Sequence, residues 1–106
     1  MVTFAEFKKL EIKIAKILEV DDHPNADKLY VIKIDTGGQI KQIVAGIRSF
    51  YKKEDLLNRQ IVVVDNLEPA VLRGVESKGM LLAAQDEKGI SIVVPDRGMA
   101  LGSCVK

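Results

Sequence analysis

The residues best suited to catalysis are few and widely separated in this chain of 106 residues. The only histidine, His23, precedes Pro24 in a turn-like stretch, and the only cysteine, Cys104, lies near the C-terminus. A catalytic triad or a zinc site of the usual kind needs several such side chains at one place. The sequence therefore predicts no catalytic residue, no metal site built from histidine and cysteine and no cofactor, and it favours a solvent-exposed imidazole for His23.

Two further stretches resemble ligand-binding loops only in part. The carboxylates of Asp21, Asp22 and Asp27 lack the regular alternation and the glycine of a calcium loop, so a capped turn is favoured, with a carboxylate metal site left open. The pair Gly37-Gly38 lacks the Lys-Ser/Thr of a phosphate loop and is typical of a hairpin turn.

Cationic side chains are better candidates for function, because they can bind the phosphates of a nucleic acid. The net charge is only +1, so the surface as a whole is not basic. Aromatic residues make up 5% of the chain and tryptophan is absent, which is a poor supply for stacking extended single strands. Shape and backbone recognition of a folded RNA therefore fits better. The candidate cations are Lys33, Lys41, Arg48, Arg73 and Lys78.

Length and composition predict one domain over residues 1–106. Hydrophobic residues make up 47% of the chain, which is enough for a folded core, and a lone cysteine cannot form an internal disulfide. No charged-then-apolar leader opens the chain, and no apolar run approaches the roughly 20 residues that cross a bilayer. We therefore expect a cytoplasmic protein with no membrane association.

Alternating apolar and polar residues predict mostly strands. Thr3 and Glu6 have the spacing of a capping box, which indicates a short helix at the start. The alternation from Leu10 to Val20 slips by one residue near Ile17, which predicts a bulge in a long bent strand. Further strands are expected over 28–35, 39–46, 61–66, 79–85 and 89–95, with a short helix around 54–57 and a last strand near Cys104.

Three strands, a short helix and two more strands with an added C-terminal strand region are the order of an all-β OB-fold, a five-stranded Greek-key barrel. Between the expected strands over 61–66 and 79–85 the chain contains "RGVESKG", residues 73–79, which the glycines predict to be a hinged, partly basic loop. We expect this loop to lie at the entrance to a buried strand.

Three separated blocks carry a family resemblance: "HPNADKLYVIKID", "QIVAGI" and "NLEPAVLRGVESKGMLLAA". In this order they resemble the structure-specific tRNA-binding domain that is found as a free dimeric protein and at the C-terminus of methionyl-tRNA synthetases. The resemblance implies a non-catalytic OB-fold homodimer that recognises the shape of folded tRNA and brings it to the catalytic part of a synthetase. Either a free-standing protein or a part of methionine-tRNA ligase fits this resemblance.

The resemblance also suggests which residues contact tRNA. Arg73 and Lys78 are expected to meet phosphates, Ser77 to bond to phosphate or ribose, and Gly79 to let the backbone approach the RNA. The full predicted tRNA-binding set is Lys33, Lys41, Gln42, Arg48, Asn66, Arg73, Ser77, Lys78, Gly79 and Met80.

Two further expectations concern an alternative function and the oligomeric state. An export-related chaperone of the same fold has similar motifs and would bind unfolded peptide in an apolar groove, so this function remains an alternative. Apolar residues near both ends exceed what the barrel core requires, which predicts a dimer interface. These residues are Phe4, Phe7, Leu10, Ile90, Ile92, Val93 and Val94.

Overall fold

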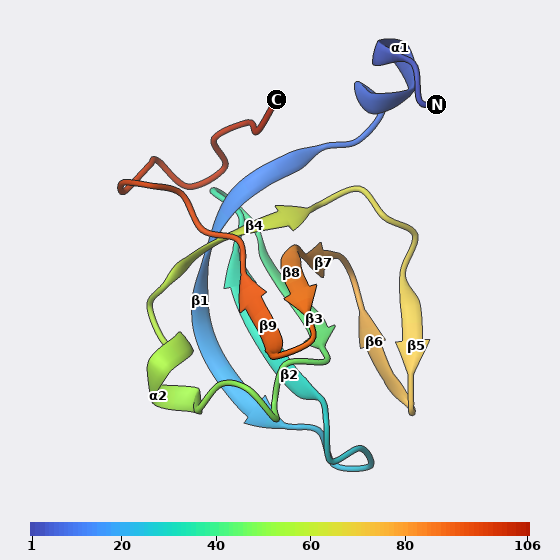
Figure 1. The fold of residues 1–106 in the computed structure, drawn as a ribbon. Coiled ribbons are helices and arrows are strands. Elements are labelled where there is room, and N and C mark those ends of the chain that lie inside the picture. Colours follow the sequence, from blue (N-terminus) through green and yellow to red (C-terminus); the bar gives the residue numbers. More distant parts are fainter.

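A computed structural model describes all 106 residues, and most of its regular structure is β-strand (Figure 1). The predicted capping box is present, because the Thr3 hydroxyl accepts a hydrogen bond from the Glu6 amide and the Glu6 carboxylate accepts one from the Thr3 amide. The elements are α1 (Phe4–Phe7), β1 (Ile12–Asp22), β2 (Tyr30–Asp35), β3 (Ile40–Ala45), α2 (Lys53–Leu56), β4 (Gln60–Val64), β5 (Ala70–Leu72), β6 (Val75–Ser77), β7 (Met80–Leu81), β8 (Ala83–Asp86) and β9 (Gly89–Ile92).

Five antiparallel strands form the main sheet in the order β3-β2-β1-β4-β7. The sheet curls back on itself, because the chain just before β7 returns to β3, where the Lys78 amide donates to the Gln42 carbonyl at 2.9 Å. This nearly closed barrel with short helices confirms the predicted all-β OB-fold.

The long strand β1 bends at a bulge, as its sequence predicts. Its pairing with β2 shifts between Ile17 and Glu19, which leaves Leu18 as the extra residue. Because the bulge changes the alternation, Ile17 and Val20 both face the main core. At the start of β1, Ile14 instead belongs to a second, smaller apolar cluster.

That second cluster is covered by the C-terminal segment, which crosses the upper part of β1 (Figure 1). Val105 and Leu101 pack on it, and the Val105 amide donates to the Ile12 carbonyl at 2.8 Å. The last strand that we expect near Cys104 is reduced to a single bridge with Lys13. The C-terminal segment therefore seals one face of β1 without adding a full strand.

The predicted hinged loop over residues 73–79 is wrong in one respect. Most of it belongs to a two-stranded hairpin, in which β5 pairs with β6 around a turn at Arg73 and Gly74. Both turn residues have positive φ, 53° and 90°, as a tight hairpin turn requires. The expected strand over 79–85 is also divided, because β7 pairs with β4 while β8 pairs with β9.

The N-terminal segment stands away from the barrel (Figure 1). Residues 1–10 are all exposed, and none of the residues of α1 is buried. Neither helix of the structure has the length and apolar character needed to span a bilayer.

Candidate nucleic-acid interface

The outer face of β2 and β3 presents three of the predicted residues in a row. Lys33 on β2 lies opposite Gln42 on β3, on the face that points away from the core. Lys78 follows, because its amide is bonded to the Gln42 carbonyl. The Gln42 side chain donates to the Glu76 carbonyl at 2.9 Å, which ties β3 to the hairpin. Gln42 therefore lies between Lys33 and Lys78 and connects β3 to the hairpin.

Lys33 and Lys78 are available for a ligand. Lys33 forms no ion pair, and Lys78 reaches only the Glu76 carboxylate, at 3.7 Å with both side chains about half exposed. An exposed pair at that distance contributes little to stability, on the order of 0–1 kcal/mol. Both ammonium groups can therefore exchange their surroundings for phosphate oxygens at low cost.

Arg73 occupies the tip of the β5–β6 hairpin, beside the loop that connects β1 to β2 (Figure 1). Its guanidinium donates to the Asn25 carbonyl at 3.1 Å, and the residue is exposed. A guanidinium has five N–H donors, so most of them remain free for phosphate. The tip therefore adds a third available cation at the end of the same face.

Lys41 is placed differently from the exposed cations. Its ammonium lies 2.7 Å from the Asp65 carboxylate, and Lys13 binds the same carboxylate at 2.9 Å. The side chains of Lys41 and Asp65 are only 15% and 11% exposed. Burial alone would raise the pKa of Asp65, but hydrogen bonds from Lys13 and Lys41 and their charges outweigh it and lower the pKa. The hydrogen bond to Asp65 raises the pKa of Lys13.

The guanidinium of Arg48 also has partners within the protein. It lies 3.4 Å from the Asp22 carboxylate and also donates to the Ala26 carbonyl. Arg48 and Lys41 thus sit in ion pairs that a phosphate would have to disrupt. Lys33 and Arg73 form no ion pair, and Lys78 has only its long, exposed contact with Glu76.

The two predicted polar contacts at Asn66 and Ser77 face the protein. The Asn66 amide accepts from the Glu11 amide at 2.8 Å and donates to the Lys9 carbonyl at 2.7 Å. Ser77 is 5% exposed, and its hydroxyl accepts from the Val44 amide and donates to the Gly79 carbonyl. Asn66 thereby holds the N-terminal segment, and Ser77 holds the base of the hairpin on β3.

Gly79 serves the closure of the barrel. Its φ is 153°, and a side chain there would bring its Cβ to 3.1 Å from the Val64 carbonyl. That atom would point at a neighbouring strand rather than at an approaching RNA. The missing side chain thus allows the segment between β6 and β7 to lie tightly on β4.

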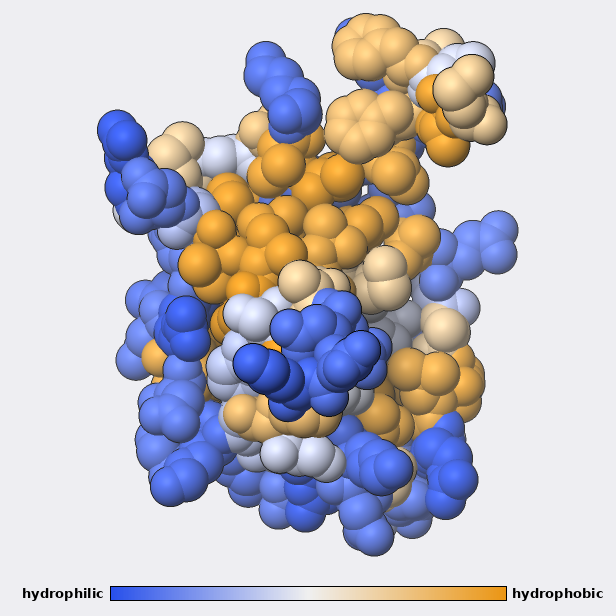
Figure 2. Space-filling model, in the orientation of Figure 1, coloured by the Kyte–Doolittle hydropathy of each residue, from blue (hydrophilic) through white to orange (hydrophobic).

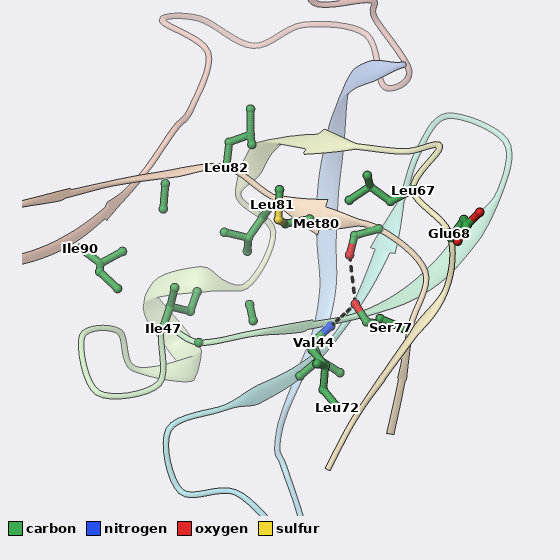
Figure 3. Close-up of a pocket in the computed structure, with 15 residues that line it drawn as sticks. Val44, Ile47, Leu67, Glu68, Leu72, Ser77, Met80, Leu81, Leu82 and Ile90 are labelled. Atoms are coloured by element: carbon green, nitrogen blue, oxygen red, sulfur yellow. Dashed lines mark hydrogen bonds between the residues drawn. The ribbon is translucent and has the colours of Figure 1, made fainter. Parts of the chain in front are cut away.

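An apolar groove of about 470 Å³ lies between the end of β3, the hairpin and β7 to β9 (Figure 3). Met80 lines it and is 47% exposed, beside Leu67 and Leu82. Figure 2 shows that a broad hydrophobic patch covers the upper part of this side of the molecule. The groove adjoins the row of cations, because Ser77 lines the groove and the amide of the next residue, Lys78, is bonded to the Gln42 carbonyl.

His23 is buried, so the expected solvent-exposed imidazole is wrong. The side chain is 3% exposed, and both ring nitrogens are in hydrogen bonds. Nδ1 accepts from the Asn25 amide at 2.9 Å, and Nε2 lies 2.8 Å from the Leu72 carbonyl. The sequence offers one signal for this arrangement, which is the polar side chain of His23 two residues before Asn25. A side chain at that spacing can accept from the backbone amide and close a turn.

Comparison with known proteins decides the family. The family described as "Putative tRNA binding domain" matches residues 12–104. The chain belongs to this family. It is 56% identical to the methionine–tRNA ligase of Pyrococcus furiosus over 105 residues, which are 99% of this chain and 14% of that protein. The predicted relationship with methionyl-tRNA synthetases is thus confirmed.

Two solved structures support the same fold for this tRNA-binding domain. A MetRS-related protein from Pyrococcus horikoshii has a TM-score of 0.93 and 28% identity, covering 100% of this chain and 98% of that one. The CsaA chaperone protein from Picrophilus torridus has a TM-score of 0.92 and 32% identity, with both chains covered completely. The chain spans about 14% of the length of the methionine–tRNA ligase from P. furiosus. The domain is therefore homologous to a small, non-catalytic region of the ligase.

Proposed function

We propose that residues 1–106 act as one non-catalytic domain that binds the shape and phosphate backbone of folded tRNA. The observation that carries this proposal is the row of available cations, Lys33, Lys78 and Arg73, on the outer face of β2 and β3 and the adjoining hairpin. In OB-folds this face, together with the loops after the first and fourth barrel strands, is where oligonucleotides bind. Membership of the tRNA-binding family supports tRNA as the ligand.

The partner that would use the bound tRNA is the catalytic part of a methionyl-tRNA synthetase, in the cytoplasm. A tRNA held by this domain stays near the catalytic part, which turns the second binding event into a local one and raises its effective concentration. The similarity to a methionine–tRNA ligase over nearly the whole chain supports this role. A free-standing form would act in the same way after binding to the synthetase.

The test of tRNA binding uses a salt series with single alanine variants. Parent protein is titrated with bulk tRNA and with plain duplex RNA, and affinity for tRNA is expected to be higher and to fall steeply with salt. Lys33→Ala, Arg73→Ala and Lys78→Ala should each weaken binding and lower the salt slope by about one unit. Lys88→Ala is the matched control, because Lys88 is an exposed cation in the β8–β9 turn.

Two outcomes would contradict the proposal. Equal affinity for duplex RNA and tRNA would remove shape recognition. Parental binding by all three variants, with normal melting, would place the binding face elsewhere on the barrel.

We also propose that the domain forms a two-fold homodimer. Phe4 is 72% exposed and Phe7 37% exposed on a segment in which no residue is buried, and such apolar surface usually marks an interface. Val93 and Val94 are 40% and 41% exposed and add to it, whereas Ile92 belongs to the main core and Ile90 packs against that core. Ile90 and Ile92 are therefore not part of the proposed interface.

Light scattering at micromolar concentration tests the dimer. The expected result is twice the chain mass, and Phe4→Ser with Phe7→Ser should convert the protein to monomer. Phe50→Ser is the matched control, because Phe50 is 49% exposed and its ring lies beside Gly89 at the β8–β9 turn, outside the set of residues proposed for the interface. A single species of 11.7 kDa for the parent would refute the dimer.

One observation favours a second candidate function, the binding of unfolded peptide. The apolar groove beside Met80 is large enough for several side chains, and the similar CsaA protein is named a chaperone. Met80→Glu should then abolish peptide binding. If the parent binds tRNA and shows no affinity for an unfolded apolar peptide, this second function is excluded.

A further inference from the structure

We infer that His23 is a positioning residue for tRNA binding, because it fastens the tip of the β5–β6 hairpin and so fixes the direction of Arg73. This inference rests on the proposed tRNA-binding function. We call the set of hydrogen bonds that join His23 and Asn25 to Leu72 and Arg73 the clasp. It links the loop after β1 to the hairpin, two segments that lie about 50 residues apart in sequence.

The hydrogen bonds of His23 identify its tautomer. Nδ1 accepts from the Asn25 amide, which always carries a hydrogen, so Nδ1 itself is unprotonated. Nε2 lies 2.8 Å from the Leu72 carbonyl, which can only accept, so Nε2 carries the hydrogen. The neutral ring thus closes its own loop with one nitrogen and holds the hairpin with the other.

Direct bonds between Asn25 and Arg73 complete the clasp. The Asn25 side chain donates to the Arg73 carbonyl at 3.4 Å, and the Arg73 guanidinium donates to the Asn25 carbonyl at 3.1 Å. All four of these groups are on the exposed residues Asn25 and Arg73, whereas His23 is buried. The contact from His23 is therefore the part of the clasp that is best shielded from competing water.

The tip of the hairpin depends on the clasp, because β6 is bonded to β3 by side-chain hydrogen bonds whereas β5 lies on the exposed side of the hairpin. Ser77 and Glu76 in β6 are bonded to β3, but every residue of β5 and both turn residues are exposed. An isolated two-stranded hairpin is marginally stable in water. Without the clasp the tip would therefore sample several orientations, and Arg73 would lose a fixed position relative to Lys33 and Lys78.

Two substitutions separate the functions of the two ring nitrogens. His23→Gln places an amide N–H near the former Nε2 and can keep the bond to Leu72. His23→Asn places an amide oxygen near the former Nδ1 and can keep the bond from the Asn25 amide, but it cannot reach Leu72. His23→Gln thus preserves the hydrogen bond to Leu72 in the hairpin, and His23→Asn preserves only the hydrogen bond from the Asn25 amide within the loop.

Hydrogen exchange of the β5 and β6 amides tests the clasp without any RNA. Loss of one neutral hydrogen bond corresponds to roughly three- to tenfold faster exchange in His23→Asn, with His23→Gln close to the parent. Equal protection in both variants would overturn the clasp. If neither variant folds, ring ¹⁵N spectra of the parent decide, because a hydrogen on Nδ1 or a rapidly exchanging Nε2–H would also overturn it.

Titration with tRNA then tests the positioning role. His23→Asn should weaken tRNA binding roughly three- to tenfold and His23→Gln should restore it. In the Arg73→Ala background, His23→Asn should add no further loss, because it acts through Arg73. An equal loss in both backgrounds, or no loss at all, would overturn positioning. Failure of the parent to bind tRNA would instead refute the proposed function. The hydrogen-exchange measurement would still test the clasp, because it uses no RNA.

Discussion

Asp65 supports the strongest quantitative prediction, because its carboxylate is shared by two lysines at the point where the barrel closes. Lys13 on β1 and Lys41 on β3 lie 2.9 and 2.7 Å from its oxygens. Asp65→Asn keeps the shape of the side chain and removes its charge. Two ammonium groups would then lie close together with no counter-charge between them.

The size of the effect follows from the burial of the three groups. Removing one partner of a fully buried pair costs about 3–5 kcal/mol, and an exposed pair is worth about 0–1 kcal/mol. The Lys13 side chain is 31% exposed and that of Lys41 is 15% exposed, so this cluster lies between those limits. We expect Asp65→Asn to lower the free energy of unfolding by about 2 kcal/mol, which for a domain of this size lowers the Tm by on the order of 10 °C.

Urea unfolding followed by circular dichroism measures this change. Asp27→Asn is the matched control, because Asp27 is exposed and forms no ion pair, so its effect should stay within about 0.5 kcal/mol. Adding Lys41→Met to Asp65→Asn should restore part of the stability, because it removes one of the uncompensated charges. Equal midpoints for Asp65→Asn and Asp27→Asn would refute the reasoning.

Three further predictions concern the same residues and the hairpin. Because the pKa of Asp65 is lowered in the folded protein, its contribution is present above about pH 4, and the stability difference between parent and Asp65→Asn should shrink as pH falls through the folded pKa; a pH-independent difference in urea midpoints would contradict this. Lys41→Met should reduce stability and leave the salt slope of tRNA binding unchanged, since its ammonium is occupied; a slope lowered by one unit would instead make it a phosphate ligand. Ser77→Ala should lower stability by about 1–3 kcal/mol, because the buried Val44 amide loses its acceptor, which thermal melting can check; a parental Tm would show that this amide finds another partner.

Local patterns in the sequence were sufficient for most strands and turns. The capping box at Thr3, the glycine pair of the β2–β3 hairpin and the phase slip near Ile17 act between residues that are close in the chain, and each is present in the structure. Alternation alone cannot say which strand a segment pairs with. For that reason it predicted one strand over 79–85, where the structure has β7 on β4 and β8 on β9.

The sequence by itself determined that this is an OB-fold of the tRNA-binding family, because alternation, turns and motif order are properties of neighbouring residues. Only the tertiary structure decided which polar side chains remain free. Lys41 and Lys33 look alike in sequence, yet closure of the barrel brings Asp65 to one and no partner to the other. His23 is likewise buried by a hairpin about 50 residues away. Partners so distant in the chain leave no local pattern, since they are set by the packing of strands and not by spacing.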